Sequence, residues 1–375
     1  CLRLGRSLWE LIKRIASWIS QEAPSFSGGS RHTEGLPTSQ TLLPEHLKKE
    51  GYMTGWIGKW HLGAAPEHSP LRRGFDEGYG FLGGGHRYQS WKENPKQEYL
   101  LSLERDGKPV EEPTHLTEAF GREASAFVRK HAQKPWFLYL AFNAPHTPNE
   151  PTPERLARFA SITDIRRRRY AAQVSLMDDA IGEVRKALRE SGQEKNTLVI
   201  FFSDNGGPIG EQGNGSINTP LRGGKGSHLE GGVRVPFVLS YPGTLPPGAT
   251  YAQPVSSLDV FATALALAQL PFPTDKPYDS VNLLPYLTNK RTESPHETLF
   301  WHNAAGAVWA VRQGHYKLIH TKTGPDQLYD LDSDPGETSD LAQKLPEKVA
   351  ELTKRYRDWS KDMAPPAFKG LGGKK

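Results

Sequence analysis

The chain has 375 residues, with 47 Lys and Arg against 42 Asp and Glu, and a formal net charge of +5. Hydrophobic residues make up 36% and charged residues 24%, which excludes a disordered or collagen-like chain. No apolar run reaches the ~18–20 residues of a membrane-spanning helix, and the length fits two or three domains, or one large α/β domain with an appendage. The modest positive charge suits an anionic substrate without requiring one.

Cysteine and basic residues exclude further classes of site. The one cysteine, at position 1, leaves no intramolecular disulfide and no Cys-based zinc or iron–sulfur centre. The densest basic run, Arg166–Arg169, lacks the interleaved aromatic residues of a nucleic-acid site, so we expect a solvated helix face there. Because the chain opens on Cys rather than Met, we expect a processed or truncated product.

Periodicity along the chain predicts strands that alternate with helices. Short apolar runs predict buried parallel strands at Met53–Ile57, Trp136–Phe142, Thr197–Phe202 and Val235–Tyr241. Helical patterns occupy Leu42–Glu50, Thr117–His131, Tyr170–Ser191 and Ser257–Ala268. This alternation predicts an α/β fold with a parallel sheet covered on both faces. After residue 299, two strands (Trp309–Ile319, Gln327–Leu331) and a helix (Pro346–Asp362) predict a smaller α+β subdomain.

Chemically useful side chains follow the predicted strands, where ligands bind in such sheets. Lys59 and His61 follow the first strand, and a continuing extended backbone would place both on one side, with Trp60 buried opposite. His146 follows the second strand, in the loop Asn143–Pro148 that two prolines stiffen. Taken singly, each of these residues would be an ordinary surface or loop residue.

The third and fourth strands add oxygen ligands and a lysine. Asp204 and Asn205 follow the third strand, and their hard oxygens beside two glycines suit Ca²⁺ or Mg²⁺, although a turn that caps the strand is the plainer alternative. The glycine-rich stretch 220–236 presents Lys225 from a backbone-lined loop, where an anion is the expected guest. Together, these placements at strand ends favour one common site.

These segments carry a resemblance to a known family. Residues 51–63, Gly-Tyr-Met-Thr-Gly-Trp-Ile-Gly-Lys-Trp-His-Leu-Gly, resemble the second signature of the type I, formylglycine-dependent sulfatases. The Ala-Pro-His-Thr-Pro, Ser-Asp-Asn-Gly-Gly and Gly-Lys-Gly…Glu-Gly-Gly-Val-Arg-Val-Pro segments are similar to that family in the same order. The resemblance covers Gly35 to Asp362 and implies an alkaline-phosphatase-like fold: a mixed, mainly parallel sheet sandwiched by helices, with a small C-terminal α+β subdomain.

The resemblance also implies a role for each candidate residue. Asp204 and Asn205 would bind one Ca²⁺, Lys59 and Lys225 would contact the sulfate, His61 would assist the nucleophile, and His146 would lie near the leaving oxygen. The implied activity is release of inorganic sulfate from a sulfate monoester, with a sulfated small molecule or polysaccharide as partner. It further implies a formylglycine-generating maturase and a periplasmic or secreted location, with no nucleic-acid partner.

The chain departs from the family at the nucleophile. The family makes formylglycine from Cys within Cys-x-Pro-Ser-Arg, preceded by a strand that ends in paired aspartates of the calcium site. Neither feature occurs in the 375 residues. The pair Asp178-Asp179 lies in a helical pattern after the signature, so we expect an ordinary helix face there. The chain as given is therefore expected to be inactive.

The first 34 residues carry a separate hypothesis. One permitted coding of Cys1–Gly5, read two nucleotides later, gives Ser-Pro-Ser-Arg, which suggests that a frameshift or sequencing error produced residues 1 to about 32. The upstream DNA decides this. The alternative is a genuine amphipathic helix through Leu8, Leu11, Ile12, Ile15 and Ile19. The predicted organisation is an aberrant or truncated segment 1–34, an incomplete core 35–298, a subdomain 299–363 and a disordered tail 364–375.

Two other functions stay open from the sequence. One is hydrolysis of phosphate or phosphonate esters, which the same lysines and metal ligands would tolerate. The other is a pseudoenzyme that binds sulfated glycan without cleaving it. Trp91, Trp301, His302 and Asn303 would suit a sugar subsite, with core packing or loop filling as the alternative.

Overall fold

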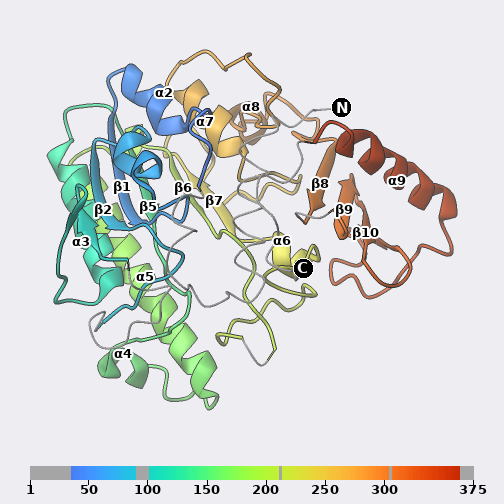
Figure 1. Cartoon of the computed structure of the whole chain (residues 1–375), viewed down its shortest axis with the longest axis horizontal. Helices are drawn as coiled ribbons and strands as arrows, with labels where there is room; N and C mark the ends of the chain where they lie inside the picture. Colours follow the sequence, from blue (N-terminus) through green and yellow to red (C-terminus); the bar gives the residue numbers. More distant parts are fainter. Residues whose placement is uncertain (1–34, 90–100, 211–212, 304–305, 364–375) are drawn as a thin grey trace. The chain divides into compact units, whose positions relative to one another are not determined.

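The computed structural model describes residues 35–89, 101–210, 213–303 and 306–363 (Figure 1). These residues form two compact units. The N-terminal unit holds the described residues up to 197 together with 213–216, and the C-terminal unit holds 198–210 and those from 217 onward. Trp91, the segment 1–34 and the tail 364–375 lie outside the described residues, so the predictions on them stay predictions. None of the described helices is both long and apolar enough to cross a membrane.

The N-terminal unit is built on a five-stranded sheet of order β4-β3-β2-β1-β5. Its strands are β1 (Met53–Lys59), β2 (Glu77–Phe81), β3 (Glu104–Arg105), β4 (Lys108–Pro109) and β5 (Trp136–Ala141), and its helices are α2 (Leu43–Lys49), α3 (Leu116–Lys130), α4 (Pro153–Ala157) and α5 (Ile165–Glu190). Strand β1 pairs in parallel with both β2 and β5. The carboxyl ends of β1 and β5 therefore lie at the same edge of the sheet.

The two faces of β1 are buried against different neighbours, as the period of two requires. A Cβ on Gly55 would lie 2.6 Å from the Phe127 ring, so this face of the strand lies against α3. Trp56 points to the opposite face, where its ring centroid lies 6.2 Å from that of Trp60. Trp60 in turn meets Phe75 edge-on at 5.8 Å. Strand β1 is thus covered on both sides, which explains why every residue from Thr54 to Gly58 is buried.

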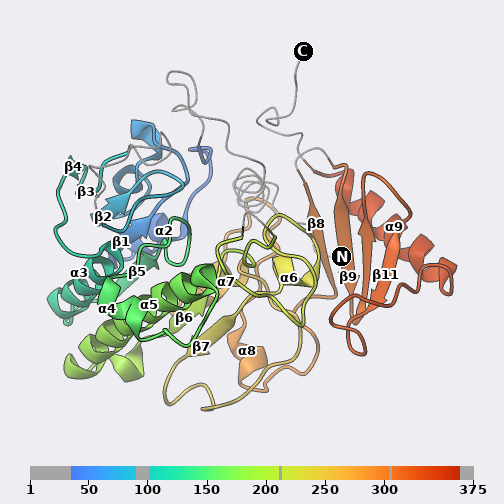
Figure 2. The ribbon, with the colours of Figure 1, turned by 90° about the horizontal axis from the view of Figure 1, so that it is seen from below.

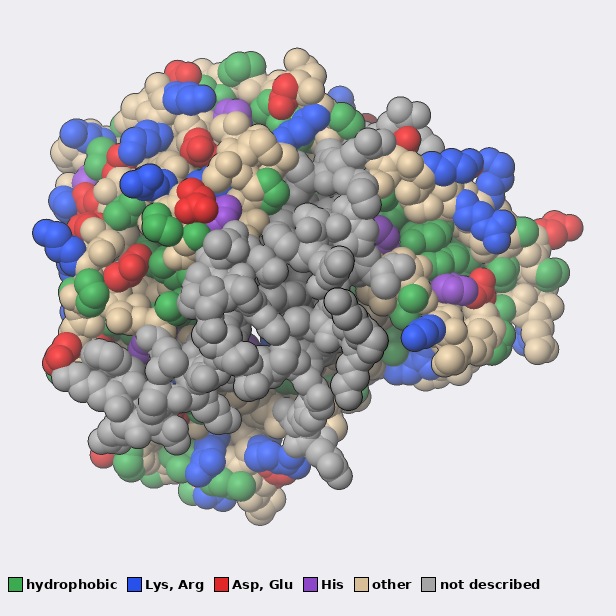
Figure 3. Space-filling model, viewed as in Figure 1, with side chains coloured by type: hydrophobic (Ala, Val, Ile, Leu, Met, Phe, Trp, Pro, Cys, Tyr) green, Lys and Arg blue, Asp and Glu red, His purple; other side chains and the backbone are tan. Residues whose placement is uncertain are grey.

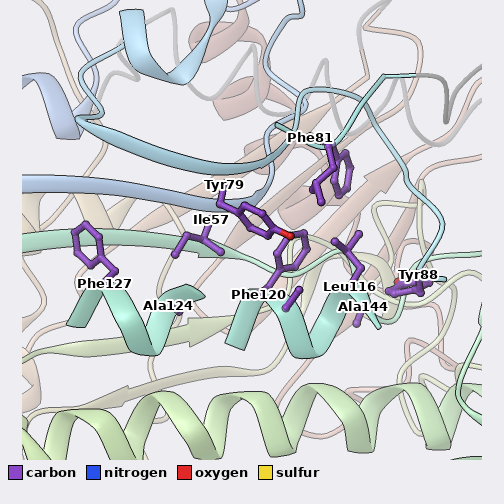
Figure 4. Packing of buried hydrophobic residues seen from close by; sticks show 11 residues of the cluster. Ile57, Tyr79, Phe81, Tyr88, Leu116, Phe120, Ala124, Phe127 and Ala144 are labelled. Carbon is purple, nitrogen blue, oxygen red and sulfur yellow. The ribbon is translucent and has the colours of Figure 1, made fainter. Parts of the chain in front are cut away.

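The core of this unit lies between α3 and the sheet (Figure 4). Phe120 of α3 is fully buried, with its ring centroid 6.1 Å from that of Tyr79 and 6.4 Å from that of Phe81. Behind α3 lies α5, in close contact, since a Cβ on Gly121 would come within 2.8 Å of Ala180 Cβ. The buried cluster joins α3 to β1 and β2 through Ile57, Tyr79, Phe81, Leu116, Phe120, Ala124 and Phe127.

The C-terminal unit contains two sheets. Its elements are β6 (Val199–Phe202), α6 (Glu230–Val233), β7 (Phe237–Ser240), α7 (Asp259–Leu267), α8 (Leu284–Leu287), β8 (Thr298–His302), β9 (Trp309–Gln313), β10 (Tyr316–His320), β11 (Gln327–Asp330) and α9 (Pro346–Ser360). Strands β8 to β11 form an antiparallel sheet of order β11-β10-β9-β8. Figure 2 shows α9 beside this sheet, where Trp359 stacks on Phe300 at 4.8 Å. Basic side chains gather over α9 in Figure 3.

The predicted fold class is confirmed, with corrections to individual strands. Each predicted helix exists within a few residues of its expected bounds. The largest difference is in α5, which begins at Ile165 instead of Tyr170. The expectation that all four apolar runs form parallel strands is wrong for one pair, because β6 and β7 are antiparallel. The segment that connects them leaves β6 and enters β7 at the same end of the two-stranded sheet, so no crossover connection is made. At this end Ser203 N donates to Pro236 O at 3.3 Å.

Other elements also differ from the sequence prediction, and several short ones, among them β8 and α4, were not predicted. The run Trp309–Ile319 is a hairpin of β9 and β10 instead of one strand, turned at Gly314 with φ of +57°. Strand β2 was missed, since Gly78 and Gly80 lower its strand propensity. Asp178 and Asp179 are exposed residues of α5, as predicted.

Candidate active site

Lys59 and His61 lie at the end of β1. Lys59 is the last residue of the strand and pairs with Phe81 of β2. His61 has a left-handed φ of +58°, and its amide donates to Leu82 O at 3.1 Å. The extended backbone ends before His61, so the shared orientation inferred from it does not follow. Trp60, between them, is buried as predicted.

The His61 ring packs closely against the backbone at Gly84. A Cβ on Gly84 would lie 2.7 Å from His61 Nε2, so only glycine fits against this ring without movement. The contact joins the turn after β2 to the turn after β1. A basic side chain and an imidazole are therefore held at one edge of the sheet.

His146 lies in the loop after β5, at the same sheet edge as Lys59. Its Nδ1 is 2.8 Å from Thr147 O, and because a carbonyl only accepts, Nδ1 carries the proton. The backbone of the loop is fixed from outside: Tyr88 Oη donates to His146 O at 3.0 Å, and Asn214 Nδ2 donates to Pro145 O at 2.9 Å. The His146 ring thus donates from Nδ1, in a loop whose backbone is bonded to Tyr88 and Asn214.

Glu150 ties a second loop to the His146 loop. Its Oε1 accepts from Arg87 Nε at 2.8 Å, and its Oε2 accepts from Tyr88 N at 2.9 Å. Its carbonyl oxygen lies 3.1 Å from His115 Nε2. Sequence reasoning missed Tyr88, Glu150 and Asn214, because they belong to no motif and lie far along the chain from their partners.

His115 makes the stability of this region depend on pH. Its Nδ1 accepts from Thr117 N at 3.2 Å at the start of α3, and burial lowers its pKa from 6.5 to about 4. The unfolded chain therefore takes up a proton at higher pH than the folded one, so stability falls as pH drops from about 6.5 to about 4. His115→Asn keeps a capping side chain and removes this titration.

We expect His115→Asn to flatten the loss of unfolding free energy between pH 6.5 and 4 by roughly 2–3 kcal/mol. Urea unfolding at a series of pH values measures it. Part of the slope remains, since burial also lowers the pKa of His86. Identical slopes for the two proteins would show that His115 does not titrate there.

In the C-terminal unit, Asp204 and Asn205 follow β6, as expected. The next residue, Gly206, donates its amide to Gly232 O at 3.0 Å, and a Cβ there would lie 1.7 Å from Gly231 O. Gly207 O accepts from Lys225 N at 3.2 Å. The Asp-Asn turn and the glycine-rich loop that carries Lys225 are therefore packed backbone to backbone.

Asn218 joins the same two segments. Its Oδ1 accepts from Gly207 N at 3.1 Å, while its Nδ2 donates to Gly207 O at 2.8 Å and to Gly223 O at 3.0 Å. One side chain thus bonds both the turn after Asn205 and the loop before Lys225. It is a further residue that sequence reasoning missed.

Asp204 and Asn205 match part of a calcium site. They offer a carboxylate and a side-chain amide oxygen on consecutive residues, which are the donors Ca²⁺ takes. Asn205 Nδ2 donates to Gly206 O at 3.0 Å, so the side-chain oxygen is the atom that would bind a cation. Six to eight oxygens surround Ca²⁺, and the described residues contain no cluster of three or more His, Cys, Asp or Glu that could hold a metal.

The six candidate residues thus fall into two groups. Lys59, His61 and His146 lie at one sheet edge of the N-terminal unit, while Asp204, Asn205 and Lys225 lie together in the C-terminal unit. Of the suggested sugar residues, Trp301 packs on the buried cluster of Ala310, Ile319, Tyr329 and Leu331, and His302 meets Trp359 at 5.2 Å. These two contacts favour the core-packing alternative.

Comparison with known proteins identifies the family. The Sulfatase family model matches residues 16–270, which is more than half of the chain. The chain belongs to the sulfatase family. A second model, the C-terminal region of N-sulphoglucosamine sulphohydrolase, matches residues 225–362. The first match includes part of the segment 1–34, whose aberrant origin stays a hypothesis.

Several relatives of this chain are known. N-acetylgalactosamine-6-sulfatase of Mus musculus is 35% identical over 294 residues, covering 76% of this chain and 55% of the relative. The "Uncharacterized sulfatase YdeN" of Escherichia coli (strain K12) is 31% identical and covers 94% and 72%. The crystal structure of Ps i-CgsB in complex with k-i-k-neocarrahexaose matches with a TM-score of 0.85 and 33% identity, over 96% of this chain and 83% of that one. The match thus spans only about half the length of the mammalian N-acetylgalactosamine-6-sulfatases.

Proposed function

We propose that this chain is part of an enzyme that hydrolyses sulfate monoesters of a carbohydrate. The main support is the family itself, in which similar chains are an N-acetylgalactosamine-6-sulfatase by name and a structure in complex with k-i-k-neocarrahexaose. The strand-end positions of the basic residues, on elements that the structure fixes tightly, agree with this chemistry.

Charge stabilisation is the role of the lysines. A sulfate monoester is an anion, and its cleavage places negative charge on the leaving oxygen. Lys59 and Lys225 would each bind sulfate oxygens. Bound Ca²⁺ would polarise the sulfate as a Lewis acid, held in part by Asp204 and Asn205.

Proton transfer is the role of the histidines. When both of its ring nitrogens are protonated, His146 would give the Nε2 proton to the departing alcohol and keep the Nδ1 proton that is bonded to Thr147 O. His61, packed against Gly84, would assist the nucleophile. Hydrolysis also needs that nucleophile, and the 375 residues contain no Cys-x-Pro-Ser-Arg segment for formylglycine.

We expect the 375-residue chain with Ca²⁺ to turn over an aryl sulfate at no more than the background rate. The same gene carrying an upstream Cys-x-Pro-Ser-Arg segment, co-expressed with a formylglycine-generating enzyme, should release inorganic sulfate. Ion chromatography of sulfate and of phosphate, from paired sulfate and phosphate esters, measures both activities.

The outcomes separate the alternatives. Turnover by the 375-residue chain would contradict its inactivity. If the protein with the added Cys-x-Pro-Ser-Arg segment releases phosphate faster than sulfate, the result would favour a phosphoesterase. If that protein binds sulfated sugar tightly but does not cleave it, the result would favour a binding protein.

A further inference from the structure

Three charged side chains are buried together in the C-terminal unit. Lys317 Nζ of β10 lies 2.7 Å from Glu230 Oε1 and 2.9 Å from Glu337 Oε1, and all three side chains are at most 2% exposed. Removing charges from water is costly even when they are paired, and apolar residues often serve stability equally well. Stability alone is therefore a weak reason for this cluster, and its position in the fold gives a better one.

Glu337 joins the cluster to the backbone of α6. Its Oε2 accepts from Glu230 N at 2.8 Å, so Glu337 holds the first residue of α6 while Lys317 holds that residue's side chain. Two arginines lie near the other oxygen of the Glu230 carboxylate: Arg234 lies 3.8 Å and Arg312 lies 4.0 Å from Glu230 Oε2. Glu230 is thus fixed at both its backbone and its side chain.

The residues after Glu230 hold the candidate site. Gly231 N donates to Arg222 O at 2.8 Å, at the start of the loop that carries Lys225. Gly232 O accepts from Gly206 N at 3.0 Å, beside the Asp-Asn turn. A Cβ on Gly231 would lie 2.4 Å from Gly223 O, so the packing leaves no slack. A shift of Glu230 would therefore move both segments.

A second contact holds the start of the same loop. Arg222 Nη2 donates to Tyr329 Oη at 3.0 Å and to Gln327 Oε1 at 3.3 Å, both on β11. The guanidinium also lies over the Tyr329 ring, 5.1 Å from its centroid. The C-terminal antiparallel sheet thus holds the Lys225 loop at Arg222 and again at Glu230.

We infer that Lys317 and Glu337 are positioning residues, which act through Glu230 to hold Lys225 and the Asp204–Asn205 turn in place. The C-terminal sheet is then the support of an anion-binding loop instead of a separate appendage. The role of Lys225 toward an anion rests on the proposed function, whereas the support of the loop rests on the contacts alone.

Hydrogen exchange of the 375-residue chain tests the support without any need for activity. In Lys317→Met, amides of residues 222–232 and 204–207 should exchange about tenfold faster, while those of α9 change little. The triple variant K317M/E230Q/E337Q removes all three charges together and guards against misfolding of the single variant. It should regain the melting temperature of the parent protein and still exchange faster at 222–232. Lys354→Met, which breaks an exposed pair with Asp358, is the matched control.

Binding of inorganic sulfate, followed by calorimetry with Ca²⁺ present, is the second readout. The triple variant should bind sulfate about tenfold more weakly than the parent protein at equal stability, because the loop that carries Lys225 is no longer held in place. Parental exchange at 222–232 in the triple variant, or faster exchange spread evenly over the C-terminal unit, would overturn the inference. If the parent protein binds no sulfate yet the exchange pattern holds, the proposed function fails and the support of the loop stands.

Discussion

Gly58→Ala should destabilise the protein by about 4 kcal/mol, because strain and a steric clash add at one position. Gly58 has φ of +112°, and a Cβ there would lie 2.0 Å from Ala141 O on the neighbouring strand β5. The clash is with backbone, which cannot rotate away. It would push apart the two strands whose ends carry Lys59 and His146. Urea unfolding followed by tryptophan fluorescence measures the loss.

Gly51→Ala is the matched control. Gly51 also has a positive φ, +82°, but no atom lies within 4 Å of the Cβ position. Only the backbone strain remains, so we expect a cost of about 1 kcal/mol. Equal losses for the two variants would mean that β1 and β5 can separate freely, and the close strand spacing would then not hold the site edge together.

Lys59→Ala and Lys225→Ala should each weaken binding of galactose 6-sulfate by roughly 10- to 100-fold, the range for losing a charged hydrogen bond. The double variant should show no saturable binding. Both effects follow if each lysine donates to sulfate oxygens of the ligand. Calorimetry with Ca²⁺ present measures the affinities, and galactose is the ligand control.

A surface lysine controls for the loss of charge. Lys354 on α9 is 79% exposed and pairs with Asp358, so Lys354→Ala should leave binding unchanged. If Lys354→Ala weakens binding as much as Lys59→Ala, the ligand is held by overall charge and the assignment of the two lysines is wrong.

Local sequence was enough to find most elements and all six candidate residues. Strand β1 and helix α3 have strong periodicities, and residues 51–63 form a motif within one short stretch. Strand β2 was not predicted, because its glycines are required by close contacts with the neighbouring strand and not by any local pattern. A Cβ on Gly80 would lie 1.9 Å from Gly58 O, a contact that no local pattern reveals.

The sequence by itself determined the family, the α/β class and which side chains stand at the strand ends, because each depends on residues close together in the chain. Only the tertiary structure decided how those side chains are held. Lys317 meets Glu230 across 87 positions, and Asn214 meets Pro145 across 69. Such pairs arise when separate elements pack, since burial then selects whichever distant groups satisfy each other's charges and hydrogen bonds.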